Sequence, residues 1–140
     1  MISKIETQED VRGLLSIFIE TWGAETLSEF VVSMQETNCL LAKNEVTGVV
    51  AGYLFYALDA RGFIEITDVG VAELFRGNGY GREMVDHICG LADCVRLSVK
   101  ESNRVARKLY ESVGFQVLHV TQNYYGVGAD GLRMEWQLNG

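Results

Sequence analysis

The chain has 140 residues, of which 48% are hydrophobic and 22% are charged, and this composition predicts a folded protein with a real core. Its net charge of −7 disfavours a protein that coats nucleic acid or an anionic membrane surface. No apolar run approaches the roughly 18 residues that span a bilayer, and no linker-like segment is visible, so we expect one domain over residues 1–140, located in the cytoplasm.

The first part of the chain is expected to be mainly helical. A short strand is predicted over residues 2–6, and Thr7 is typical of a helix N-cap, with Asp10 three residues further on. Apolar residues then recur at helical spacing from Val11 to Trp22, and again over residues 27–34 with Leu27, Phe30, Val31 and Met34. These patterns predict two amphipathic helices.

The middle of the chain is expected to form strands. Apolar segments over residues 39–44, 48–58 and 63–71 are separated by turn-forming residues, which indicates an antiparallel meander. The three cysteines are odd in number and have no C-x-x-C spacing, so they favour buried thiols over a disulfide framework or a zinc site. We therefore expect no metal.

The last part of the chain is expected to alternate helices and strands. A helix with Met84, Val85, Ile88 and Leu91 facing inward follows a glycine-rich turn. The elements expected after it are a strand over 95–99, a helix over 103–113, a strand over 115–120 and a strand over 132–138. This order predicts an α+β fold with a mixed, mostly antiparallel sheet flanked by helices.

The glycine-rich turn Arg76–Gly81 joins a strand to a helix, where free backbone amides and the positive helix end favour an anion such as phosphate. No Lys-Ser/Thr pair follows the glycines, so a nucleoside-triphosphate P-loop is excluded. A dinucleotide fingerprint counted from Gly77 would need its third glycine at Arg82, so that reading fails as well. Taken alone, the turn could also be simply a tight connection.

Two further motifs accompany this turn. Arg76, Gly79 and Gly81 are spaced R-x-x-G-x-G, with the apolar Val71 five residues before the arginine. About 22 residues after Gly81 comes the segment SNRVARKLYESVGF, which contains Asn103, Tyr110, Gly114 and Phe115. With these motifs and its order of elements, the whole chain resembles the GCN5-related N-acetyltransferase (GNAT) superfamily.

Within the superfamily, the C-terminal half is most similar to the bacterial ribosomal-protein-alanine N-acetyltransferases. The likeness rests on SNRVARKLYESVGF and on NYYGVGADGLRMEWQL. The chain departs from that group in two places. The group carries a glutamate, proposed as the base, five residues before the asparagine, where this chain has Ser98. A proline before the glycine-rich turn is also absent, with Ala72 and Glu73 in its place.

The resemblance implies acetyl-CoA as co-substrate, held in a slot where two central strands of the sheet splay apart. The pantetheine arm would pair with the backbone of Val69, Gly70 and Val71, and the amide of Val71 would stabilise the oxyanion. The pyrophosphate would bind Arg76, Gly77, Asn78, Gly79, Tyr80 and Gly81, and Asn103 would also contact the coenzyme.

The resemblance also implies catalytic roles. Tyr110 would protonate the departing thiolate, and Glu65, eleven residues before Arg76, occupies the place of a catalytic glutamate in the histone-acetylating branch. Water remains an alternative base, because an N-terminal amine with a pKa near 7.7–8.0 is partly neutral already. Tyr124 and Tyr125 would border the acceptor, unless they serve only as packing.

The predicted reaction transfers acetyl from acetyl-CoA to a primary amine, most of all a protein N-terminal amine. A small-molecule amine acetyltransferase and a non-catalytic CoA-binding regulatory domain are the alternatives. The expected partners are acetyl-CoA and the amine, with no nucleic acid or membrane, in a monomer or homodimer.

Charge is unevenly distributed along the chain. Residues 1–75 carry 12 acids and 4 bases, while residues 76–140 carry 7 acids and 8 bases. The basic half contains the expected coenzyme-binding motifs.

Overall fold

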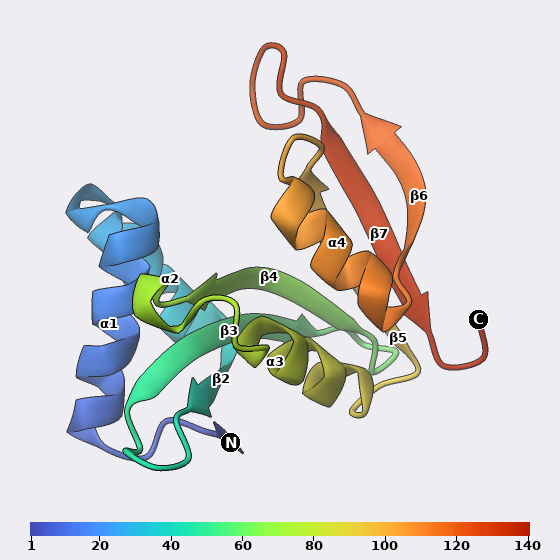
Figure 1. Ribbon diagram of the computed structural model, residues 1–140. Helices are drawn as coiled ribbons and strands as arrows, with labels where there is room; N and C mark the ends of the chain where they lie inside the picture. Colours follow the sequence, from blue (N-terminus) through green and yellow to red (C-terminus); the bar gives the residue numbers. More distant parts are fainter. The chain divides into compact units, whose positions relative to one another are not determined.

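Seven strands and four α-helices make up the structure, a computed structural model that describes residues 1–140 (Figure 1). The strands follow the order β1-β2-β3-β4-β5-β7-β6 in a mixed sheet, which confirms the predicted fold class. The chain divides into unit 1, Met1–Ala57 with Asp68–Met84, and unit 2, Leu58–Thr67 with Val85–Gly140. No helix combines the length and apolar character needed to cross a bilayer.

Unit 1 contains the two expected N-terminal helices and an antiparallel set of strands. Its elements are β1 (Ile2–Ser3), α1 (Gln8–Trp22), α2 (Leu27–Glu36), β2 (Asn38–Lys43), β3 (Val50–Leu58) and the short 3₁₀ turns Ala24–Thr26 and Glu73–Phe75. Both β1 and β3 pair antiparallel with β2, and Leu41 lies opposite Tyr53. The antiparallel β2–β3 pair predicted from the sequence is therefore confirmed.

A capping box starts α1, as the sequence predicts. The Thr7 hydroxyl accepts the amide of Asp10 at 3.1 Å, and the Asp10 carboxylate accepts the amides of Thr7 and Glu6. Lys43 Nζ on β2 lies 3.0 Å from Asp10 Oδ1, and both side chains are almost fully buried. Burial alone would raise the pKa of Asp10, but these amides and Lys43 outweigh it and hold the pKa below its usual value. The cap thus anchors α1 to the sheet.

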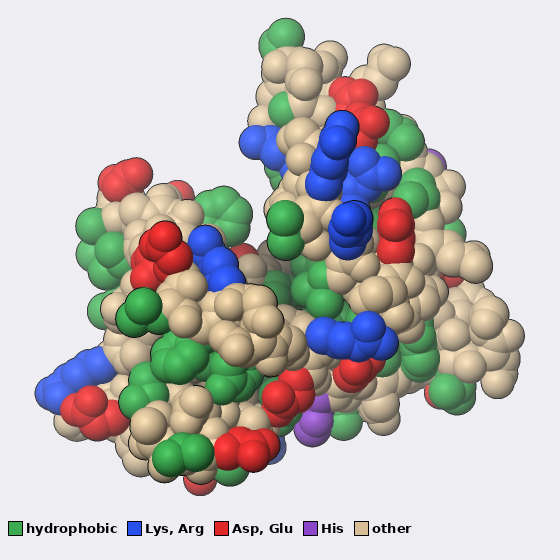
Figure 2. Space-filling model, in the orientation of Figure 1, with side chains coloured by type: hydrophobic (Ala, Val, Ile, Leu, Met, Phe, Trp, Pro, Cys, Tyr) green, Lys and Arg blue, Asp and Glu red, His purple; other side chains and the backbone are tan.

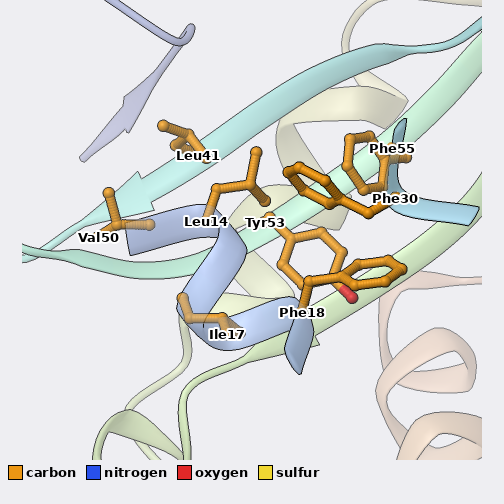
Figure 3. Packing of buried hydrophobic residues seen from close by; sticks show 8 residues of the cluster. All are labelled: Leu14, Ile17, Phe18, Phe30, Leu41, Val50, Tyr53 and Phe55. Carbon is orange, nitrogen blue, oxygen red and sulfur yellow. The ribbon is translucent and has the colours of Figure 1, made fainter. Parts of the chain in front are cut away.

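The core of unit 1 is aromatic and lies between α1, α2 and the sheet (Figure 3). The cluster consists of Leu14, Ile17, Phe18, Phe30, Leu41, Val50, Tyr53 and Phe55. The rings of Phe18 and Phe30 lie 5.1 Å apart between centroids, and Tyr53 is fully buried beside Phe55 at 5.2 Å. This packing holds β3 firmly against the two helices.

Three apolar residues that the helical patterns place toward the core are instead exposed. Trp22, at the end of α1, is 52% exposed because the chain turns away at Gly23, where φ is 94°. Leu27 and Val31 on α2 are also exposed, and among their apolar neighbours only Phe30 is buried in this helix. The predicted helices are correct, but these inward-facing assignments are wrong.

Unit 2 is built on strands β5 (Cys94–Lys100), β6 (Gln116–Thr121) and β7 (Gly131–Gln137), with α4 (Arg104–Val113). Three elements are divided between the units: β4 (Ile64–Val71), α3 (Tyr80–Cys89) and β3, whose last residue Leu58 belongs to unit 2. In unit 2 a parallel ladder joins Ile64–Ile66 of β4 to Val95–Leu97 of β5. β7 pairs antiparallel with both β5 and β6, so the last strand inserts between them.

The two faces of β5 and β7 differ sharply. One face is apolar and buried, with Val95, Leu97, Val99, Leu132 and Met134, and Figure 1 shows α4 running along these strands. The other face carries polar and charged side chains, described below.

Leu91 does not face inward from α3, although the helical pattern predicts that it does. It is 53% exposed because α3 ends at Cys89, so that prediction is wrong.

Candidate active site

The glycine-rich turn lies in unit 1 and leads directly into α3. Gly77 and Gly79 adopt φ of 80° and 83°, which L residues with side chains rarely adopt, and open space surrounds the position of a Cβ at each. The first intrahelical bond runs from the amide of Glu83 to the carbonyl of Gly79 at 2.9 Å. The amides of Tyr80 and Gly81 therefore have no carbonyl one turn earlier, as at any helix start. The turn can accept an anion.

Side chains around the turn hold its shape. Arg76 Nε donates to the carbonyl of Val71 at 3.2 Å, which ties the turn to the end of β4. The side-chain Nδ2 of Asn78 donates to the carbonyl of Phe75 at 3.0 Å, and Nδ2 of Asn44 donates to the hydroxyl of Tyr80 at 3.2 Å. The Arg76 guanidinium also lies 4.0 Å from Glu20 and its side chain is 57% exposed.

The end of β4 in unit 1 is packed against a hydrogen-bonded trio. The Tyr53 hydroxyl and the Trp22 indole N–H both donate to Asp68 Oδ2, at 2.8 and 3.0 Å. Burial raises the pKa of Asp68, although the two hydrogen-bond donors lower it. Burial also raises the pKa of Tyr53, and the nearby negative charge of Asp68 raises it further. Gly70 makes room for Tyr53, since a Cβ there would lie 2.3 Å from the tyrosine Cε1. These contacts give Asp68 a structural role at the end of β4.

In unit 2, three adjacent strands bring together Glu65 of β4, Ser98 of β5 and Arg133 of β7. Arg133 Nη1 donates to Glu65 Oε2 at 2.7 Å, and Nη2 donates to Oε1 at 2.5 Å. Nη1 also donates to the Ser98 hydroxyl at 3.2 Å. These bonds to Glu65 raise the pKa of Arg133. The carboxylate named above as a base is therefore held by a bidentate ion pair.

This cluster lies in a pocket of about 580 Å³ in unit 2. The pocket is lined by Glu65, Ile66, Thr67, Ser98, His119, Thr121, Tyr124, Tyr125, Gly131, Leu132 and Arg133. Hydroxyl, imidazole and charged groups dominate its side chains, so it suits a polar ligand rather than an apolar one.

The loop before β7 supplies both tyrosines to the pocket. Their rings lie 4.8 Å apart in a T-shaped pair, and burial raises the pKa of Tyr125. Asp130 accepts the amide of Asn123 at 2.9 Å, which closes the loop on itself. A Cβ on Gly131 would lie 2.9 Å from the Cβ of Tyr124, so this glycine lets the tyrosine pack on the strand. Tyr124 and Tyr125 thus lie beside Glu65 in one pocket, as the acceptor prediction requires.

Asn103 and Tyr110 frame α4 in unit 2. The Asn103 side chain caps the helix by accepting the amide of Ala106 at 3.2 Å, and Gly114 ends the helix with φ of 115°. Tyr110 is 7% exposed, with its ring 5.7 Å from that of Phe115. Lys and Arg side chains gather over α4 in Figure 2.

The predicted site residues are divided between the two units. Val69, Gly70, Val71 and the glycine-rich turn lie in unit 1, and the other site residues lie in unit 2. The splayed slot and the joint role of these residues therefore stay predictions.

Arg133 is the main site residue that the sequence reasoning missed. Its partner Glu65 lies 68 residues away, and the contact exists only because β7 inserts next to β5. One signal was available: Arg133 and Glu135 alternate with apolar residues along an otherwise buried strand, which indicates a polar face with partners. His119 and Thr121 of β6 carry no comparable signal.

The fold and the glycine-rich turn together define a protein of the acetyltransferase class. The model of the Acetyltransferase (GNAT) family matches residues 9–115, most of the chain, and the chain belongs to this family.

The chain is similar to known members of the family. It is 37% identical over 73 residues to the N-alpha-acetyltransferase RimI of Mycobacterium tuberculosis, covering 50% of this chain and 46% of that protein. The chain spans about half the length of the curated relatives it matches. Among solved structures, the ribosomal-protein-S18-alanine N-acetyltransferase from Escherichia coli has a TM-score of 0.78 at 22% identity, over 99% of this chain and 93% of that one.

A second solved structure shares the fold with a coenzyme bound. It is an acetyltransferase from Bacillus subtilis in complex with CoA, with a TM-score of 0.76 at 17% identity over 98% and 97% of the two chains. At these identities the two solved structures establish the fold.

Proposed function

We propose that this chain transfers the acetyl group of acetyl-CoA to a primary amine, and that the amine is a protein N-terminus. The observation that carries the proposal is the turn at Arg76–Gly81. Its positive-φ glycines and the backbone amides at the start of α3 suit an anion such as a phosphate. The turn also lies inside the segment that matches the family. The names of the RimI relatives support the choice of acceptor.

The proposed chemistry is a direct attack. The neutral amine nitrogen forms a bond to the thioester carbon, the carbonyl oxygen takes negative charge, and the C–S bond then breaks to release CoA thiolate. The amide of Val71 is our proposed donor to the oxyanion. Phenols ordinarily have a pKa near 10 and thiols one near 8.5. The phenol of Tyr110 is our proposed proton donor to the departing thiolate.

The neutral amine nitrogen must lose one proton as it becomes the amide, during or after the attack. In our proposal Glu65 receives it, after the amine has displaced Arg133 from the carboxylate. An N-terminal amine needs less help than a lysine, whose ordinary pKa is near 10.4, because much of it is neutral at physiological pH. The proposed acceptor and the single carboxylate in this pocket are therefore compatible.

The pocket beside Glu65 gives the acceptor a place to bind in this proposal. Its volume of about 580 Å³ and its tyrosine pair suit the first residues of a peptide chain. Such a pocket could equally hold a small polar amine, so the choice between a peptide and a small molecule needs an experiment.

The test is an acceptor screen that measures release of CoA thiol from acetyl-CoA. One arm contains peptides with the N-terminal sequences of ribosomal proteins, each matched by the same peptide with a blocked N-terminus. The other arms contain polyamines, aminoglycosides and free amino acids. We expect turnover with free peptide N-termini and none with blocked ones. Tight CoA binding with no acceptor-dependent thiol release would contradict an enzyme and favour a regulatory domain.

A further inference from the structure

The Glu65–Arg133 ion pair faces a cavity rather than a packed interior. Both residues line the pocket of about 580 Å³, and their side chains are 38% and 26% exposed. Each charge is therefore accessible to a ligand that enters the pocket. The pair is also preorganised, because the Ser98 hydroxyl holds the guanidinium from a third strand.

A second ion pair, which joins β5 to β7, offers a comparison. Arg96 Nε donates to Glu135 Oε2 at 2.6 Å, and the carboxylate of Glu135 is 9% exposed and also accepts from Gln137. Neither Arg96 nor Glu135 lines the large pocket. Arg96 lines a separate pocket of about 270 Å³ and Glu135 another of about 140 Å³, so Glu65 and Arg133 differ from this pair in lining one cavity together.

The charges of the accessible pair must be rebalanced when an acceptor binds. An amine that takes the Glu65 carboxylate withdraws it from Arg133, and the guanidinium is then left with the Ser98 hydroxyl. A half-buried guanidinium that loses its charged partner costs free energy. An acceptor that also carries a carboxylate avoids this loss, because its amine replaces Arg133 on Glu65 while its carboxylate replaces Glu65 on Arg133.

We propose that Arg133 is a specificity-determining residue that binds a carboxylate of the acceptor, so that this protein acetylates amines with a carboxylate nearby. This inference rests on the proposed function. Two sources supply the same chemistry: the α-carboxylate of a free amino acid, and an acidic side chain close to the N-terminus of a peptide. The planar guanidinium binds either of them through two parallel hydrogen bonds.

The test uses acceptors matched except for this carboxylate, and each kcat/KM is expressed per neutral amine, because converting a carboxylate to an amide also lowers the pKa of a nearby amine. Alanine is compared with alaninamide, and a peptide with aspartate at its second position is compared with the same peptide carrying asparagine. We measure kcat/KM from thiol release. For the wild-type protein we expect the carboxylate member of at least one pair to be favoured about 10- to 100-fold, the usual range for hydrogen bonds to a charged group. The pair that shows the preference identifies the source.

Variants assign the preference to Arg133. Arg133→Met should abolish the discrimination, Arg133→Lys should retain part of it, and Arg96→Met is the matched control that should retain all of it. Thermal unfolding shows which variants are folded, and the lysine variant still reports on the cation if the methionine variant is not. Discrimination that survives in Arg133→Met would overturn the assignment.

The inference and the proposed function fail in different ways. Equal kcat/KM for acid and amide in both pairs refutes the role of Arg133 and leaves acetyl transfer intact. If no acceptor is turned over, the proposed function fails, and calorimetric binding of the same acceptors to the CoA-loaded protein then decides the inference. Tighter binding of the carboxylate member, lost in Arg133→Met, supports it; equal binding or no binding overturns it.

Discussion

Gly70→Ala tests how closely the end of β4 is fitted to the core of unit 1. A Cβ at position 70 would lie 2.3 Å from Cε1, 2.7 Å from Cζ and 2.9 Å from the hydroxyl of Tyr53. To reach an ordinary contact the ring must retreat by about 1 Å. Tyr53 is fully buried, with Phe18 at 6.1 Å and Phe55 at 5.2 Å between ring centroids, so there is little space for that movement.

The cost has two parts. Inserting a methyl group into a well-packed core costs about 1–3 kcal/mol. A displaced Tyr53 also loses its 2.8 Å hydrogen bond to the Asp68 carboxylate, and a bond to a charged group contributes about 1.5–3 kcal/mol. We therefore expect Gly70→Ala to reduce the free energy of unfolding by about 3–6 kcal/mol, a large share of the roughly 5–15 kcal/mol of a typical domain.

Urea unfolding of a double-mutant cycle measures this coupling. Tyr53→Leu removes the ring atoms that clash, so Gly70→Ala should cost less than about 1 kcal/mol in that background. The reasoning is refuted if Gly70→Ala alone changes the free energy of unfolding by less than about 0.5 kcal/mol, or if its cost is the same in both backgrounds.

Three further predictions concern other parts of the molecule. Tyr110→Phe should lower kcat about 100-fold with little change in acetyl-CoA affinity measured by calorimetry; an unchanged kcat removes the phenol from the mechanism. Gly79→Ala should weaken acetyl-CoA binding about 10-fold, because an L side chain at φ 83° costs about 1–2 kcal/mol. Gly62→Ala is the control: its φ is 81° and the space around its Cβ position is also open, so it should lose similar stability but no affinity for acetyl-CoA. The pKa of Asp10 in the folded protein lies below its unfolded value near 3.8. The contribution of this carboxylate to stability is therefore complete above pH 3.8 and disappears as the pH falls through the folded pKa. In urea unfolding, Asp10→Asn should cost about 3–5 kcal/mol at pH 7 and less at pH 3, and equal costs at both pH values would contradict the ion pair with Lys43.

Local signals in the sequence predicted the elements well. Thr7 and Asp10 form the expected capping box, and Gly114 ends α4 in the left-handed conformation where the motif places it. These features depend on residues three to eleven positions apart, so their chemistry is readable along the chain. The inward-facing assignments of Trp22 and Leu91 were wrong because each lies where a helix ends, and periodicity does not define the last turn.

The polar cluster was not predictable in the same way. Glu65 was selected from the family motif, but its contact with Arg133 depends on β7 inserting between β5 and β6 and on the register that sets Ser98 opposite Arg133. A one-residue shift of that register would turn Arg133 to the apolar face. Strand order and register are set by the packing of the whole sheet, and one sequence read alone does not reveal them.

The convergence of two strands on one guanidinium has an evolutionary consequence. Glu65 and Ser98 lie on neighbouring strands and both bond to Arg133, and strands in a sheet are about 4.8 Å apart. That spacing is within the length of a glutamate side chain. An acidic residue could therefore be lost from one strand and regained on the next while its charge stayed in the same pocket, so related proteins can keep one local charge pattern without keeping the residue that provides it.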